Sequence, residues 1–115
     1  MLINLSNHPS TRWTEAQMTA AVDTYDSVVD LPFPNIPPAM SSEELNDLTA
    51  EYLKKILDKD PHTVHVMGEM TFTFRMVLIL KKMKIPCIAS TTNRTVEEKD
   101  GKKIVQFEFV QFREY

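Results

Sequence analysis

The sequence contains only two glycines, Gly68 and Gly101, and a single cysteine, Cys87. A dinucleotide-binding fingerprint or a Walker loop needs several closely spaced glycines, so neither motif is present. No Cys/His cluster has the spacing of a zinc site, and neither a nucleophile elbow nor an HExxH sequence occurs. These absences argue against hydride transfer, ATP hydrolysis and zinc chemistry. We therefore expect no metal and no cofactor.

The single cysteine cannot form an internal disulfide, and it lies in the apolar run 85–89, which predicts a buried, unreactive thiol. The N-terminal segment is too short and too polar for a signal peptide. No apolar run approaches the roughly 18 residues that a membrane span requires. We expect a cytoplasmic protein that makes no membrane contact.

The chain also lacks an excess of basic residues. It carries 13 Lys and Arg against 16 Asp and Glu, so its formal net charge is −3. A broad nucleic-acid surface normally requires a positive excess, so duplex binding is disfavoured, whereas a short anionic ligand held by a few local cations remains compatible. The length of 115 residues predicts one domain that spans the whole sequence, residues 1–115.

Apolar periodicity predicts alternating strands and helices. Capping-box spacing at Thr14–Gln17 and Ser41–Glu44 predicts two helix starts, and Asp100-Gly101 predicts the turn of a C-terminal β-hairpin between 95–98 and 104–110. Strands are expected at 2–5, 27–31, 62–67 and 85–90, and helices at 15–25, from Ser41 to Asp60-Pro61, and at 71–83. The proline-rich segment 32–38 predicts a rigid, packed crossover. The fold class is therefore α/β, with a mostly parallel sheet, helices on both faces and a C-terminal hairpin.

Small polar residues follow three of the predicted strands. In open α/β sheets ligands bind beyond the carboxyl ends of the strands, where helix N-termini also attract anions. The three groups are Ser6, Asn7 and His8; Gly68, Glu69, Met70 and Thr71; and Ser90, Thr91, Thr92, Asn93 and Arg94. This pattern is typical of a site for a ligand that carries phosphate and ribose.

Most of these residues also have a purely structural interpretation. Ser6 and Asn7 could close a turn, and His8 could be an exposed loop residue. Glu69 could complement the helix dipole, and a carboxylate there opposes a nearby phosphate. His65, between two valines, is interpreted as a satisfied core or sheet residue. The run from Ser90 to Arg94 holds more hydrogen-bonding groups than a turn requires.

Three stretches together resemble the small CRISPR-associated CARF-like proteins of type III systems, a group that includes ring nucleases acting on cyclic oligoadenylates. They are Leu2–His8; Val66–Glu69 with Thr73; and Ile88–Arg94 followed by Val96–Glu98 and Phe109–Tyr115. One departure concerns the first stretch, because Asn7 separates Ser6 from His8, which are adjacent in the family pattern. The resemblance implies a Rossmann-like, CARF-like domain that forms a homodimer with the ligand across its interface.

The implied activity is that of a ring nuclease, which linearises cyclic oligoadenylate, with cyclic tetra-adenylate as the expected ring. A ribose 2′-OH would attack the neighbouring phosphate without a metal, so the protein would supply position and charge. A non-catalytic cyclic oligoadenylate-binding module and an unrelated partner-binding α/β domain are the alternatives. The expected catalytic residues are Arg94, Thr92 and His8, and the expected ligand-binding residues are Ser6, Asn7, Gly68, Glu69, Met70, Thr71, Ser90, Thr91 and Arg113.

Arg94 is the first candidate for the phosphate oxygens, because its planar guanidinium matches them with two parallel hydrogen bonds. Arg113 and Arg12 are the next candidates for this role.

Overall fold

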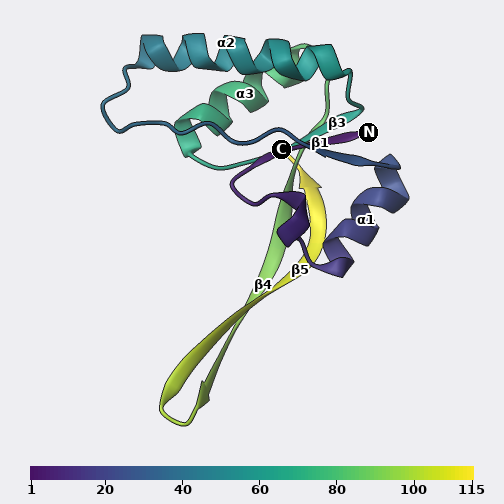
Figure 1. The fold of residues 1–115 in the computed structure, drawn as a ribbon, viewed down its shortest axis with the longest axis vertical. Coiled ribbons are helices and arrows are strands. Elements are labelled where there is room, and N and C mark those ends of the chain that lie inside the picture. Colours follow the sequence, from purple (N-terminus) through teal and green to yellow (C-terminus); the bar gives the residue numbers. More distant parts are fainter.

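A five-stranded sheet with the order β2-β1-β3-β4-β5 forms the centre of the molecule, in a computed structural model that describes all residues from 1 to 115 (Figure 1). The first four strands pair in parallel, and the last pair, β4 and β5, is antiparallel. In chain order the elements are β1 (Leu2–Ser6), the 3-10 turn η1 (Ser10–Arg12), α1 (Glu15–Tyr25), β2 (Val28–Asp30), α2 (Ser42–Lys59), β3 (Thr63–Met67), α3 (Met70–Lys82), β4 (Cys87–Lys99) and β5 (Lys102–Glu114). The predicted α/β class with a mostly parallel sheet is confirmed.

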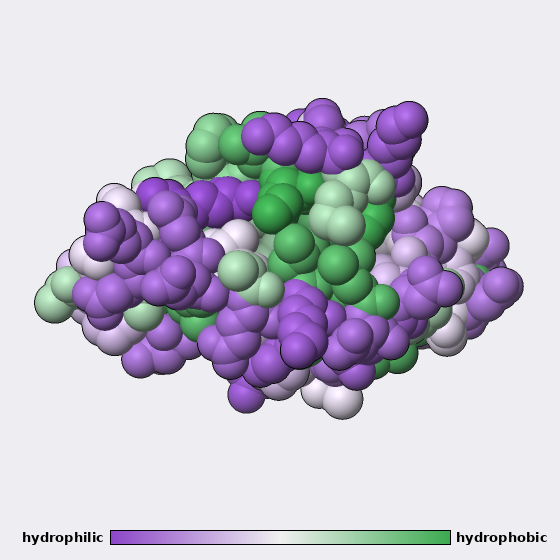
Figure 2. All heavy atoms as spheres, turned by 90° about the horizontal axis from the view of Figure 1, so that it is seen from above, coloured by the Kyte–Doolittle hydropathy of each residue, from purple (hydrophilic) through white to green (hydrophobic).

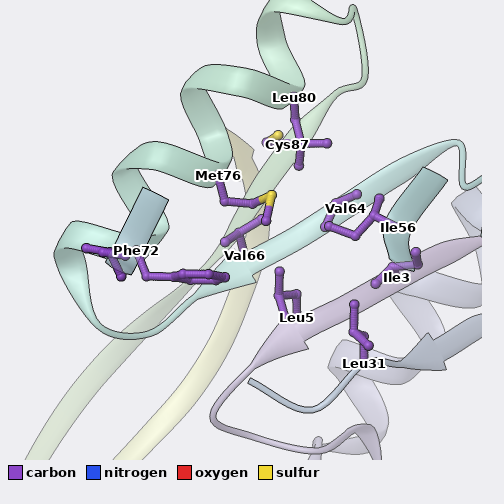
Figure 3. Packing of buried hydrophobic residues seen from close by; sticks show 11 residues of the cluster. Ile3, Leu5, Leu31, Ile56, Val64, Val66, Phe72, Met76, Leu80 and Cys87 are labelled. Carbon is purple, nitrogen blue, oxygen red and sulfur yellow. The ribbon is translucent and has the colours of Figure 1, made fainter. Parts of the chain in front are cut away.

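The two faces of the sheet carry different residues because side chains alternate along each strand. Ile3 and Leu5 of β1 and Val64 and Val66 of β3 point to the face covered by α2 and α3, where they meet Phe72 and other core side chains (Figure 3). The opposite face buries a smaller cluster, Leu2 and Ile88 with Ala21 of α1. The larger core therefore lies under α2 and α3, and α1 covers the second face only in part.

The helix caps agree with the predicted starts, with one difference. Ser41 and Glu44 form a complete, reciprocal capping box at the start of α2. At the start of α1, the Thr14 hydroxyl accepts a hydrogen bond from the Gln17 backbone N–H at 3.2 Å, but no return bond is made. The predicted reciprocal box is wrong at this helix, which leaves the Gln17 side chain free for the cavity described below.

The proline-rich segment forms a packed crossover without helix or strand, as predicted. Phe33 and Ile36 pack against the main core, and the Phe33 ring lies edge-on to Phe72 with 5.1 Å between centroids. A Cβ at Gly68 would lie 2.4 Å from the Phe33 ring. The segment thus closes over the end of β3, at a point where only glycine fits.

The polar run after the predicted fourth strand is not a loop. Residues 87–99 form one continuous strand, and β5 pairs with it along its length. The expectation of a strand that ends at Ser90 was wrong. The backbone N–H and C=O groups after Ser90 need hydrogen-bond partners, and pairing with β5 supplies them along the whole polar run. Within β4, only Cys87 and Ile88 pair with β3. The remainder of β4 therefore has β5 as its single strand neighbour, and this two-stranded part projects from the body (Figure 1). We call residues 91–110 the arm.

Polar side chains dominate the surface seen from the α2 side, although a strip of apolar side chains crosses it (Figure 2). Large apolar side chains are also exposed on α3 and on the arm. None of the three helices combines the length and apolar character needed to cross a bilayer.

Candidate functional site

A cavity of about 450 Å³ lies on the α1 face of the sheet, at the carboxyl ends of β1 and β3. Its walls come from the end of β1, the η1–α1 segment, the end of β3 and the facing residues of β4 and β5. The strand order reverses its direction of growth between β1 and β3, because β2 lies on one side of β1 and β3 on the other. Such a switch point is where open α/β sheets bind ligands. The position predicted from strand ends therefore coincides with a cavity.

Four of the predicted site residues line this cavity together. Ser6 and His8 come from the end of β1, and Ser90 and Thr92 come from β4. They are brought together because β3 alone separates β1 from β4 in the sheet. Their hydroxyl and imidazole groups can both donate and accept hydrogen bonds.

The group that follows β3 does not reach this cavity. Gly68 and Met70 instead line a second hollow of about 380 Å³ with Phe74 and Tyr115, which is mostly apolar. Met70 is 83% exposed. The expected contribution of this group to a shared ligand site is therefore not supported by its position.

The N-terminus of α3 is already occupied by the protein's own carboxylate. Glu69 accepts hydrogen bonds from the backbone N–H groups of Thr71 and Phe72, at 2.8 and 3.0 Å, and from the Thr71 hydroxyl. These bonds, with those from Thr71 largest, lower the pKa of Glu69. A negative charge fills the position that a ligand phosphate would take, so Glu69 and Thr71 act as a helix cap.

Three other predicted residues lie outside the cavity, two of them because of strand alternation and register. Thr91 points to the face opposite Thr92, and its hydroxyl donates to the Gln111 carbonyl at 3.1 Å. Arg113 pairs with Ala89 and faces the same opposite side. Asn7 is exposed and borders a neighbouring hollow beside β2.

Arg94 lies on the same face as Thr92, two residues farther along the arm, and it is exposed outside the cavity lining. The arginine that lines the cavity is instead Arg12, an exposed residue at the end of η1, three residues before α1 begins. Arg12 is thus the structurally better candidate for a phosphate, and Arg94 is placed to reach only a ligand that extends out along the arm.

One wall of the cavity is aromatic. Trp13 enters from the η1–α1 segment, and Phe107 and Phe109 enter from β5 opposite Arg94 and Thr92. Sequence reasoning assigned none of the three to the site. Phe107 and Phe109 could not be placed there, since β5 reaches the cavity only through its pairing with β4. Aromatic faces stack on nucleobases regardless of base identity, typically with about 1–3 kcal/mol per base.

A hydrogen-bonded row under the cavity floor sets the orientation of Asn4. The Asn4 Nδ2 group donates to the His8 carbonyl and to Asp30 Oδ1, both at 2.9 Å. Asp30 is itself held by the backbone N–H and hydroxyl of Ser10. Because both Nδ2 hydrogens have acceptors, the Asn4 Oδ1 atom is the acceptor of the amide, and the Ser6 hydroxyl donates to it at 2.7 Å.

The orientation of Asn4 fixes the tautomer of His65. His65 Nδ1 lies 3.0 Å from Asn4 Oδ1, so Nδ1 carries the hydrogen and donates it. The other ring nitrogen, Nε2, then presents a lone pair, and it lies 3.3 Å from the Ser90 hydroxyl oxygen at the cavity wall. His65 is 2% exposed, and the Trp13 and Phe112 rings lie edge-on to it. The interpretation of His65 as a buried, satisfied residue is confirmed, but it omitted that the ring lines the cavity.

Burial of the imidazole ring, followed by the nearby charge of His8, lowers the pKa of His65 to about 4. The ring is therefore neutral at pH 7, and its Nε2 lone pair is an acceptor for the Ser90 hydroxyl hydrogen. The Met67 sulfur, 3.1 Å from the same hydroxyl, is the weaker alternative acceptor. Burial also raises the pKa of the Cys87 thiol to about 11, which agrees with the unreactive thiol expected from the sequence.

A family model described as the uncharacterized protein MJ1673 family matches residues 1–113. The chain belongs to this family. No curated protein and no solved structure matches the chain.

The buried ring predicts a pH-dependent stability. The unfolded chain protonates His65 below its ordinary pKa of 6.5, whereas the folded ring stays neutral down to about pH 4. Between these values the free energy of unfolding should fall by roughly 1.4 kcal/mol per pH unit, about 3 kcal/mol in all. Urea unfolding of the wild type and of His65→Asn at pH 7, 6, 5 and 4 measures this contribution. The wild type's advantage should shrink as the pH falls, and a constant difference between the two would contradict the assignment.

Proposed function

We propose that this chain binds a cyclic oligoadenylate, with cyclic tetra-adenylate as the expected ring, and linearises it. The observation that carries the proposal is the composition of the cavity, which combines one guanidinium, several hydroxyls and an aromatic wall at the sheet's switch point. These groups match phosphate, ribose and base respectively. The α/β sheet is compatible with the Rossmann-like, CARF-like domain that the sequence resemblance implies.

Phosphate recognition is assigned to Arg12, whose planar fork matches phosphate oxygens with two parallel hydrogen bonds. The hydroxyls of Ser90 and Thr92, on the same face of β4, are placed for ribose and phosphate oxygens. Trp13 and Phe107 offer faces or edges for an adenine base. Each of these residues lines the one cavity, so a single nucleotide unit can contact all of them.

The size of the cavity favours a two-fold assembly. A volume of about 450 Å³ lies in the lower part of the range of about 300–1,000 Å³ found for small-molecule pockets, so one protomer accommodates part of a ring. The arm face that continues from the cavity exposes Val96, Val105 and Phe107, which are 50%, 41% and 62% accessible. A two-fold homodimer would cover this face and present the same residues to both halves of a cyclic ligand.

Cleavage in this proposal needs no metal. A ribose 2′-oxygen attacks its own 3′-phosphate, the bond to the 5′-oxygen breaks, and the product carries a 2′,3′-cyclic phosphate. The protein contributes by holding the attacking oxygen in line and by stabilising charge on the phosphate oxygens.

The test is incubation of the purified protein with cyclic tetra-adenylate and cyclic hexa-adenylate in EDTA, followed by chromatography. Arg12→Ala should lower the single-turnover rate by about 10²–10³, because it removes a donor to the phosphate oxygens. Arg75→Ala is the matched control, since this guanidinium lies on α3 and outside the cavity lining, and its rate should stay within about fivefold of the wild type. Arg94→Ala tests the alternative phosphate site on the arm.

An intact ring after prolonged incubation with excess wild-type protein would overturn the catalytic proposal. Tight binding without cleavage would identify a binding module, and absence of both would leave a partner-binding domain. A rate that depends on Arg94 and not on Arg12 would contradict the assignment of the phosphate site.

The apolar face of the arm predicts that the protein forms a dimer through it. Val105 lies on the apolar arm face, whereas the neighbouring Ile104, also 41% accessible, lies on the opposite face. Val105→Asp should shift the protein from dimer to monomer, because it places a charge in the interface. Ile104→Asp should remain dimeric. Light scattering at micromolar concentration measures both, and a monomeric wild type would contradict the shared-site arrangement.

A further inference from the structure

Four polar side chains form a continuous hydrogen-bonded row across the sheet, one from each parallel strand. Asp30 of β2 bonds Asn4 of β1 at 2.9 Å, Asn4 bonds His65 of β3 at 3.0 Å, and His65 bonds Ser90 of β4 at 3.3 Å. The strand register places Asn4 directly beside both Asp30 and His65. The row thus starts at an anchored carboxylate and ends at a hydroxyl on the cavity wall.

The row is chemically directed as well as continuous. Asn4 and His65 are 1% and 2% exposed, so each depends on its partners for every hydrogen bond. Since Asn4 accepts from His65 Nδ1, the His65 Nε2 lone pair faces Ser90. A hydroxyl next to an imidazole lone pair, with the imidazole oriented by a third group, is the arrangement in which proteins activate oxygen nucleophiles.

We infer that Ser90 and His65 are the proton-accepting pair of this site. The inference rests on the proposed function and names the group that removes the proton from the attacking 2′-OH. Ser90 contacts the substrate hydroxyl directly, and His65 acts through Ser90. The hydroxyls of Thr92 and Ser6 also line the cavity, but neither of them lies beside a free imidazole lone pair.

The bond between the 2′-oxygen and phosphorus forms while the bond between phosphorus and the 5′-oxygen breaks. The 2′-OH proton passes to the Ser90 oxygen, and the Ser90 proton passes to His65 Nε2. The departing 5′-oxygen takes a proton from solvent, and the His65 imidazolium returns its proton to solvent after product release.

The rest of the row offsets part of the cost of charging His65. Burial disfavours the imidazolium, but its Nδ1–H already donates to Asn4, whose amide is polarised by the Asp30 carboxylate. Hydrogen bonds in such a chain strengthen one another in a low-dielectric interior. Asp30 therefore acts as a positioning residue at the far end of the row.

Two substitutions separate proton transfer from structure. In His65→Asn the amide nitrogen can keep the bond to Asn4 while Nε2 is lost, and Ser90→Ala removes the hydroxyl. The control for the first is His62→Asn, on a histidine just before β3 that is exposed and outside the cavity lining. The control for the second is Ser27→Ala, at an exposed serine just before β2 that lies outside the cavity lining. The readouts are the Kd for cyclic tetra-adenylate and the single-turnover cleavage rate in EDTA.

A general base typically contributes about 10²–10⁴ to a rate. His65→Asn and Ser90→Ala should therefore lose about 10²-fold or more in rate. The Kd of His65→Asn should change by less than about threefold, and that of Ser90→Ala by no more than about tenfold, because it loses one hydrogen bond to the ligand. His62→Asn and Ser27→Ala should stay within about fivefold of the wild-type rate. If His65→Asn does not fold, the comparison of Ser90→Ala with Ser27→Ala decides the question alone.

Wild-type cleavage combined with full rates in the folded His65→Asn or in Ser90→Ala would overturn the inference and leave the proposed function standing. Kd values that weaken in parallel with the rates would also overturn it, because they would show a role in binding or folding. An intact ring with the wild type would remove the proposed function, and the inference with it.

Discussion

The site depends on one constraint, which is that the two amide hydrogens of Asn4 both have acceptors, the His8 carbonyl and Asp30. This leaves the Asn4 oxygen to receive hydrogen bonds from Ser6 and His65. A single buried amide therefore holds the turn after β1 and sets the His65 tautomer. Removal of any member would leave the others unpaired in the interior, at a cost of about 1–3 kcal/mol for each group.

The cavity follows from how the sheet is covered. The α2–α3 layer packs on the apolar side chains of one face, whereas α1 buries only a small cluster on the other. The uncovered part of that second face lies at the carboxyl ends of β1 and β3, where the polar row crosses the sheet. The β4–β5 pair then supplies the remaining wall, so the arm that exposes apolar surface also carries the aromatic residues of the site. In the proposed function the arm therefore takes part in both ligand binding and dimer formation.

Local patterns in the sequence were sufficient for the parts of the structure that depend on neighbouring residues. The helix at 15–25 and the packed proline crossover were predicted because caps, helical periodicity and proline act locally. The length of β4 was not predicted, because its outer half forms a strand only by pairing with β5. A register irregularity between Thr91 and Thr92, where β5 carries the extra residue Val110, also decides that Phe109 lies opposite Thr92. His65 was interpreted only as a core residue because its neighbours Val64 and Val66 are apolar, yet they point to the opposite face of the sheet.

The central claim is that the hydrogen-bonded row fixes the His65 ring with its Nε2 lone pair toward the cavity. Nitrogen-15 NMR of the imidazole side chains at pH 7 measures this directly. We predict a neutral His65 ring with the hydrogen on Nδ1 and an unprotonated Nε2. The chemical shift of Nε2 should change in Ser90→Ala. A charged ring at pH 7, or a neutral ring with the hydrogen on Nε2, would contradict it.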